Sequence, residues 1–88
     1  MAEINEVLIK KSAQDQLRKV PSKLRRQSIL ATIKGLAAEA HPETARQLLP
    51  SGLFRIRTGD WRVIYFLNTK KVTVLTIKDG HRLKDYAR

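Results

Sequence analysis

The sequence predicts a single small α+β domain in the order β-α-α-β-β-β, an antiparallel meander with an N-terminal helical hairpin packed on one face of the sheet. Two patterns indicate this class. Apolar residues recur at helical spacing over residues 12–41, and residues 53–78 hold three runs rich in β-branched and aromatic residues. The 88 residues suffice for one modest core, so we expect one domain over residues 1–88.

The N-terminal part predicts a short strand and then a helix. In residues 4–10, Val7 and Ile9 fall on one face of an extended segment. Ser12 is a suitable N-cap for the first helix, whose apolar face continues until Pro21 interrupts it. We therefore expect two helices joined at this proline.

The second, longer helix is predicted from about Ser22 to near His41. Its apolar residues form a stripe, and its basic residues lie on the opposite side. The helix should end there because Pro42 disfavours the α conformation in the residue before it. Residues 42–52 then form a connection with room for one helical turn, closed by a Pro-Ser-Gly turn signal.

Strand signals dominate the C-terminal part over three segments, residues 53–58, 61–67 and 72–78. Gly59 and Asp60 separate the first two and suit a two-residue turn with glycine at its first central position. Such a turn pairs Arg57 with Arg62. A three-residue turn would instead place Arg62 on the core face, where an unpaired charge is costly. We therefore predict the two-residue register.

The predicted register gathers basic side chains on one face of the sheet. Because strand side chains alternate, Arg55, Arg57 and Arg62 share the face that the helices do not cover. Like charges directly across a sheet are destabilising, so this arrangement favours an anion bound between them. Gly80 would let the chain turn sharply and bring residues 81–86 to the rim of the same face.

The charge of the chain predicts a polyanionic partner. Eighteen Lys/Arg against eight Asp/Glu give a net charge of +10, for which nucleic acid is the leading candidate and an acidic protein the other. The basic residues on the helices are interpreted as a solvated or partner-facing surface. The chain has no cysteine, no signal-peptide pattern and no apolar run of about 20 residues, so we expect a cytoplasmic protein without membrane contact.

The string F-R-I-R-x-G-D-W-R-V-I-Y, followed by V-T-V-L and G-H-R-x-x-D-Y, resembles the RelE family of bacterial toxins, which are ribosome-dependent mRNA endonucleases of the RelE/ParE superfamily. The resemblance implies the toxin of a type II toxin–antitoxin system, acting as a metal-independent endoribonuclease without a cofactor. It also implies three partners: the ribosome with its mRNA, an antitoxin with an acidic or amphipathic segment, and operator DNA bound only by the toxin–antitoxin complex.

The same resemblance assigns candidate site residues. Those with a catalytic role are Arg57, Arg62, Arg82, Tyr86 and His81, and those that contact RNA are Arg55, Lys78 and Lys84. In RNA cleavage the 2′-OH attacks the adjacent phosphate, and guanidinium groups stabilise the charge that develops. Tyr86 is the candidate general base, and His81 is the alternative proton carrier because histidine titrates near neutral pH.

Two other functions fit the sequence less fully. A ParE-like inhibitor would share the fold and act by binding DNA gyrase, but that branch generally lacks the full set of Arg62, Arg82 and Tyr86. A plain nucleic-acid-binding module needs only the charge and does not explain why the basic residues gather on one strand face.

Overall fold

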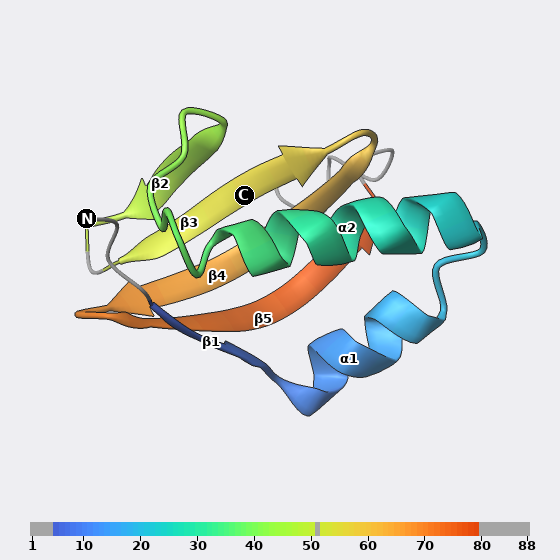
Figure 1. The fold of residues 1–88 in the computed structure, drawn as a ribbon, viewed down its shortest axis with the longest axis horizontal. Coiled ribbons are helices and arrows are strands. Elements are labelled where there is room, and N and C mark those ends of the chain that lie inside the picture. Colours follow the sequence, from blue (N-terminus) through green and yellow to red (C-terminus); the bar gives the residue numbers. More distant parts are fainter. Residues whose placement is uncertain (1–4, 51, 80–88) are drawn as a thin grey trace.

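The α+β fold class is confirmed by a computed structural model that describes residues 5–50 and 52–79. Within these ranges the elements are β1 (Glu6–Ile9), α1 (Lys11–Arg18), α2 (Lys23–Gly35), β2 (Ala45–Leu49), β3 (Leu53–Thr58), β4 (Trp61–Asn68) and β5 (Lys71–Asp79). The strands form one five-stranded sheet in the order β1-β5-β4-β3-β2. All neighbours are antiparallel except β1 and β5, which are parallel. Both helices lie on one side of the sheet (Figure 1).

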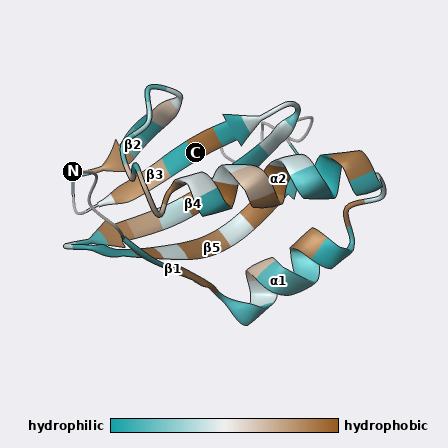
Figure 2. Cartoon of the chain, viewed as in Figure 1, coloured by the Kyte–Doolittle hydropathy of each residue, from teal (hydrophilic) through white to brown (hydrophobic). Residues whose placement is uncertain are grey.

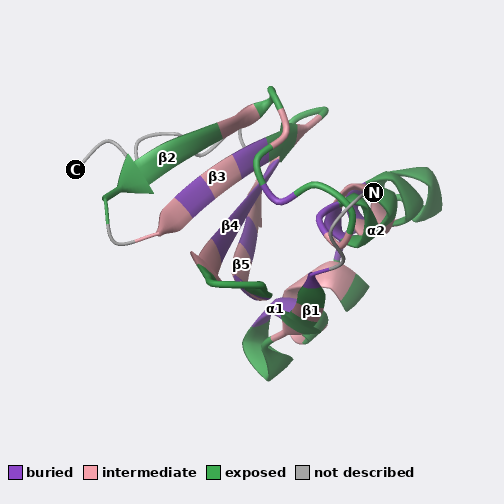
Figure 3. Ribbon diagram, turned by 60° about the vertical axis from the view of Figure 1, so that its left-hand side comes forward, coloured by how far each residue is buried: buried purple, intermediate pink, exposed green. Residues whose placement is uncertain are grey.

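The hydrophobic core fills the space between the helices and one sheet face. Hydrophilic and hydrophobic residues alternate along β3 (Figure 2), and its buried residues alternate with half-buried or exposed ones (Figure 3). The core side chains are Ala13, Val20, Ile29, Ile33, Leu36, Ala40, Phe54, Ile56, Val63, Tyr65, Val72, Val74 and Ile77. The side chains on the sheet face away from the helices therefore lie outside this core.

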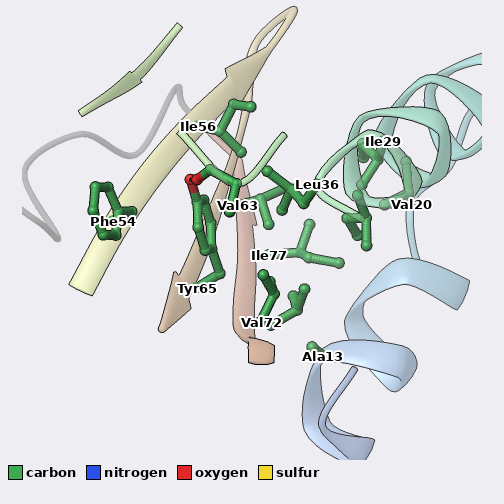
Figure 4. Close-up of a cluster of buried hydrophobic side chains, with 13 residues drawn as sticks. Ala13, Val20, Ile29, Leu36, Phe54, Ile56, Val63, Tyr65, Val72 and Ile77 are labelled. Carbon is green, nitrogen blue, oxygen red and sulfur yellow. The ribbon is translucent and has the colours of Figure 1, made fainter. Parts of the chain in front are cut away.

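Tyr65 is the largest fully buried side chain of this core, with 0% of its surface exposed (Figure 4). Its ring stacks on Phe54 with centroids 5.5 Å apart, and its hydroxyl donates a hydrogen bond of 2.8 Å to the carbonyl oxygen of Ala40. Burial, reinforced by the negative charge of Glu39, raises the pKa of Tyr65 to about 12. Tyr65 thus serves the core.

Replacing Tyr65 by Phe is expected to lower the free energy of unfolding at neutral pH by about 1–3 kcal/mol, because the Ala40 carbonyl loses its donor. The folded state holds the Tyr65 proton up to pH 12, whereas the unfolded chain releases it near pH 10. The protein with Tyr65 therefore loses stability as pH rises from 10 to 12, whereas the phenylalanine variant does not. Urea unfolding of both proteins across this range checks this, since their stability difference should shrink steadily with pH.

The segment predicted as a connection, residues 42–52, contains a strand, and this prediction was wrong. β2 pairs antiparallel with β3, bringing Ala45 opposite Ile56 and Arg46 opposite Arg55. Four of its five residues are exposed, so its sequence carries little strand signal of its own. Its strand conformation comes from hydrogen bonding to the edge of β3.

Two helix boundaries also differ from prediction. The N-cap of α1 is Lys10 rather than Ser12, and α2 ends at Gly35 instead of near His41. The buried side chain of Asn5 donates to the carbonyl oxygens of Leu36 and Ala37 at 3.2 and 3.3 Å. These carbonyl oxygens bind the segment that precedes β1 instead of continuing the helix. The chain therefore leaves the helix before it reaches the proline. The predicted start of α2 is confirmed, because the Ser22 hydroxyl accepts from the Arg25 backbone N–H.

The β5 edge is protected by two different elements. β1 pairs with its first half, from Lys71 to Val74. Further along, the side-chain carbonyl of Gln16 in α1 accepts hydrogen bonds from the Ile77 backbone N–H at 2.7 Å and from the Thr76 hydroxyl at 3.0 Å. The exposed edge that a free strand would offer to other chains is thus covered on both halves. Neither helix within the described residues is long and apolar enough to cross a membrane.

Candidate nucleic-acid interface

The β3–β4 hairpin has the predicted two-residue turn. Gly59 has a φ of 61°, a left-handed conformation that glycine adopts without strain. Thr58 pairs with Trp61, and Arg57 pairs with Arg62, as predicted. The register also pairs Arg55 with Ile64, so the three arginines share the sheet face opposite the helices.

A first row of basic side chains crosses three strands next to the turn. Arg57 on β3 lies opposite Arg62 on β4, and Arg62 lies opposite Lys78 on β5. Arg57 is exposed, Lys78 is half-buried, and Arg62 is only 6% exposed. Three adjacent basic side chains at one level of the sheet concentrate positive charge there, which favours the approach of an anion.

A second row lies two residues further from the turn. Arg55 on β3 pairs with Arg46 on the edge strand β2, which adds a second pair of like charges on the same face. Arg46 is exposed, whereas Arg55 is half-buried with its Nε shielded from solvent. Sequence reasoning missed Arg46 because β2 itself was missed. We define the basic face by both rows: Arg46, Arg55, Arg57, Arg62 and Lys78.

The buried position of Arg62 gives the first row a fixed centre. It lies between the neighbouring strands, and its Nε is also shielded from solvent, so the base of the guanidinium has little freedom. A planar guanidinium held in this way presents donors in a fixed geometry, which suits a phosphate better than a mobile ammonium would. The arrangement can bind a phosphate group and stabilise negative charge on it.

Part of the predicted site lies beyond the structure. Among the predicted residues, Arg55, Arg57, Arg62 and Lys78 come together on one face. The remaining candidates, His81, Arg82, Lys84 and Tyr86, lie outside the described residues. Within the described part of the chain, no group of three or more His, Cys, Asp or Glu residues is placed to hold a metal ion.

Comparison with known proteins agrees with this architecture. The family described as "ParE toxin of type II toxin-antitoxin system, parDE" matches residues 7–85. Comparison with curated protein sequences gives no significant match.

Among solved structures, a chain of the archaeal RelE–RelB complex from Pyrococcus horikoshii OT3 is 30% identical, with a TM-score of 0.80, over 90% of this chain and 98% of that one. A mutant of the Escherichia coli RelE toxin in the free state is 15% identical with a TM-score of 0.74, over 99% and 93% of the two chains. A chain of the RelB–RelE complex from Methanococcus jannaschii is 17% identical with a TM-score of 0.71, over 92% and 99%. The last two show likeness of fold alone.

The family match covers most of the chain, which therefore belongs to the RelE/ParE superfamily and is a toxin of a type II toxin–antitoxin system.

Proposed function

We propose that this toxin is a metal-independent endoribonuclease that cleaves mRNA in the ribosomal A site and thereby inhibits translation in the cytoplasm. The observation that carries the proposal is the first row of the basic face, in which Arg57, Arg62 and Lys78 lie side by side with Arg62 buried at the centre. A row of this kind suits a single phosphate in a defined place better than diffuse contact with a polyanion.

In this proposal the row binds the scissile phosphate. The substrate's own 2′-OH loses its proton and attacks the phosphorus to form a 2′,3′-cyclic phosphate. The bond to the 5′ oxygen breaks, that oxygen takes up a proton from solvent, and negative charge builds on the phosphoryl oxygens during the step. Arg57 and Arg62 stabilise that charge through hydrogen bonds from their guanidinium groups. Arginine stays protonated, so neither residue can remove the 2′-OH proton.

The proton carriers come from the C-terminal segment. Tyr86 is the proposed general base, and neighbouring arginines would favour its ionised form. His81 is the alternative, and Arg82 would add a further guanidinium at the phosphate. Arg55 and Lys84 would contact the RNA.

The toxin is proposed to be held inactive by an antitoxin. Two of the similar structures are RelE–RelB complexes of archaeal proteins, which supports a partner of the same kind here. With a net charge of +10, the toxin favours an acidic or amphipathic segment of that partner. Operator DNA would be bound by the complex and not by the toxin alone.

A ParE-like inhibition of DNA gyrase is the second candidate, because the matching family is described as ParE. Brief expression of the toxin followed by mapping of mRNA 5′ ends separates the two. Codon-spaced cuts in translated messages that are lost in Arg82→Ala and kept in Lys34→Gln are the expected result. Lys34 is exposed on α2 and serves as the charge-matched control. Intact mRNA with arrested DNA replication would overturn the endonuclease and support gyrase inhibition.

A further inference from the structure

We propose that Phe66, together with Leu49 and Leu53, forms a platform on which a nucleobase of the bound RNA stacks, beside the basic face. These three apolar side chains lie in one row across β4, β3 and β2. The inference rests on the proposed function in taking RNA as the ligand, and it adds a site for a base to the proposed site for a phosphate.

The register of the sheet places the row on the face away from the helices. Leu49 lies opposite Leu53, and Leu53 lies opposite Phe66. The two neighbours of Phe66 along β4 are Tyr65, which is part of the core, and Leu67, which packs against it. Because side chains alternate along a strand, Phe66 points to the other face, and its cross-strand neighbour Leu53 points there with it.

The hydrophobic core does not account for these three side chains. None of them is among the described residues that form the core or pack against it. Leu49 is 51% exposed, and Leu53 and Phe66 are half-buried. Within residues 5–50 and 52–79, the contacts between aromatic rings do not include Phe66. An aromatic ring that lies outside the core in a partly open apolar row is available to a ligand.

Gly52 holds the row in place. Its N–H donates to the Leu49 carbonyl oxygen at 3.1 Å, and its carbonyl oxygen accepts from the Leu67 N–H at 2.8 Å. A Cβ atom built on Gly52 would lie 3.5 Å from Cε1 of Phe66, so the ring lies close to the backbone of this turn. The platform is therefore ordered before a ligand arrives, which lowers the entropic cost of stacking a base on it.

Exposed cations lie on the same face as the row. Arg46 and Arg55 form the next level of the sheet, Arg57 lies one level further, and both Arg46 and Arg57 are exposed. Same-face positions repeat about every 7 Å along a strand, so the Leu53 position lies about 7 Å from Arg55 and about 13 Å from Arg57. An extended dinucleotide covers this distance, so one RNA strand can reach the cations and the platform together.

A sheet face with these two parts suits single-stranded RNA. In a common RNA-binding fold, aromatic side chains on the open face of a sheet stack the bases, and positively charged surfaces beside such rings follow the backbone. Every base has a flat π-face, so the platform accepts any base. An acidic protein segment with apolar residues would match the same surface, and the experiment separates the two ligands.

The test combines variants of the platform with RNA that lacks one base. Ribosomes are programmed with an mRNA that carries 2′-O-methyl groups across the A-site codon, which permits binding without cleavage, and one abasic residue is moved along the codon and its neighbours. At one position this residue should weaken binding of the original toxin by about 5–10-fold, the low end for one stacked base. Phe66→Leu should weaken binding of the intact mRNA by a similar factor and should be insensitive to that abasic residue.

Three further variants separate stacking from folding. Phe66→Tyr keeps the ring and should bind the intact mRNA like the original toxin. Leu49→Ala should weaken binding by about 2–5-fold, whereas Leu24→Ala, the same change at a 75% exposed leucine on the helix side, should not. Urea unfolding without RNA should give similar stabilities for Phe66→Leu and Phe66→Tyr, because both keep an apolar contact with Leu53.

RNA affinity of Phe66→Leu equal to that of the original toxin would overturn the platform. Weaker binding with no abasic position whose effect the variant removes would also contradict it, because the ring would then serve the fold or meet another surface. Full RNA affinity with lost binding of the antitoxin would assign the row to a protein segment instead. Coupling in a toxin that binds but cuts no mRNA would support the platform and overturn the proposed function, whereas absence of binding to the programmed ribosomes would overturn both.

Discussion

Replacing Arg57 by Gln is expected to lower the rate of mRNA cleavage on the ribosome by about 10²–10³-fold, the usual cost of removing one donor from a charge-stabilising site. The same change should leave the free toxin as stable as before, or more stable by up to about 1 kcal/mol, because it removes one of two like charges paired across β3 and β4. Single-turnover cleavage on programmed ribosomes and urea unfolding without RNA measure the two effects.

The matched control is Lys70→Gln, which removes the same charge from the β4–β5 turn, away from the basic face. Both the cleavage rate and the stability of this variant should equal those of the original toxin. A drop in stability for Arg57→Gln would mean that the residue serves the fold, and retained cleavage would remove it from the site. An opposite response of activity and stability is therefore specific to a functional charge.

Replacing Gly52 by Ala is expected to destabilise the fold by about 3–5 kcal/mol, from backbone strain and overpacking together. Gly52 has a φ of 116°, and a Cβ atom there would lie 2.5 Å from the backbone carbonyl oxygen of Leu67. Neither group can move easily, because the Leu67 N–H donates to the Gly52 carbonyl oxygen at 2.8 Å. Thermal and urea unfolding should show a large loss relative to a typical domain stability of about 5–15 kcal/mol.

The control for this change is Gly35→Ala at the end of α2. Nothing lies within 4 Å of a Cβ atom built there, and alanine favours the helix over glycine. This variant should gain about 0.5–1 kcal/mol. Equal stabilities for the two alanine variants would contradict the close approach between Gly52 and β4.

Rules that depend only on neighbouring residues were sufficient to predict the β3–β4 hairpin and the arginines that it places on one face. The Gly59-Asp60 turn sets the register of β3 and β4 through neighbouring residues alone, so the shared face of Arg55, Arg57 and Arg62 followed from the sequence. The core face followed as well, because alternation is a property of every strand.

Contacts between distant segments account for what the sequence did not reveal. The helix α2 stops early because Asn5 binds the carbonyl oxygens of the two residues that follow it, and a residue so far back along the chain leaves no local signal. β2 is a strand only because the β3 edge is available, and Arg46 was missed with it. Arg25 meets Gly59 only through the packing of α2 against the sheet.

The parallel pairing of β1 with β5 determines when the chain can finish folding. Glu6 pairs with Lys71, so the earliest and latest strands of the described chain must find each other across nearly its whole length. Such non-local pairing is slow to form, and β1 and α1 lack their sheet partner until β5 has been synthesised. A protein whose proposed target is the translating ribosome would therefore be incompletely folded, and inactive, until its own β5 has been made.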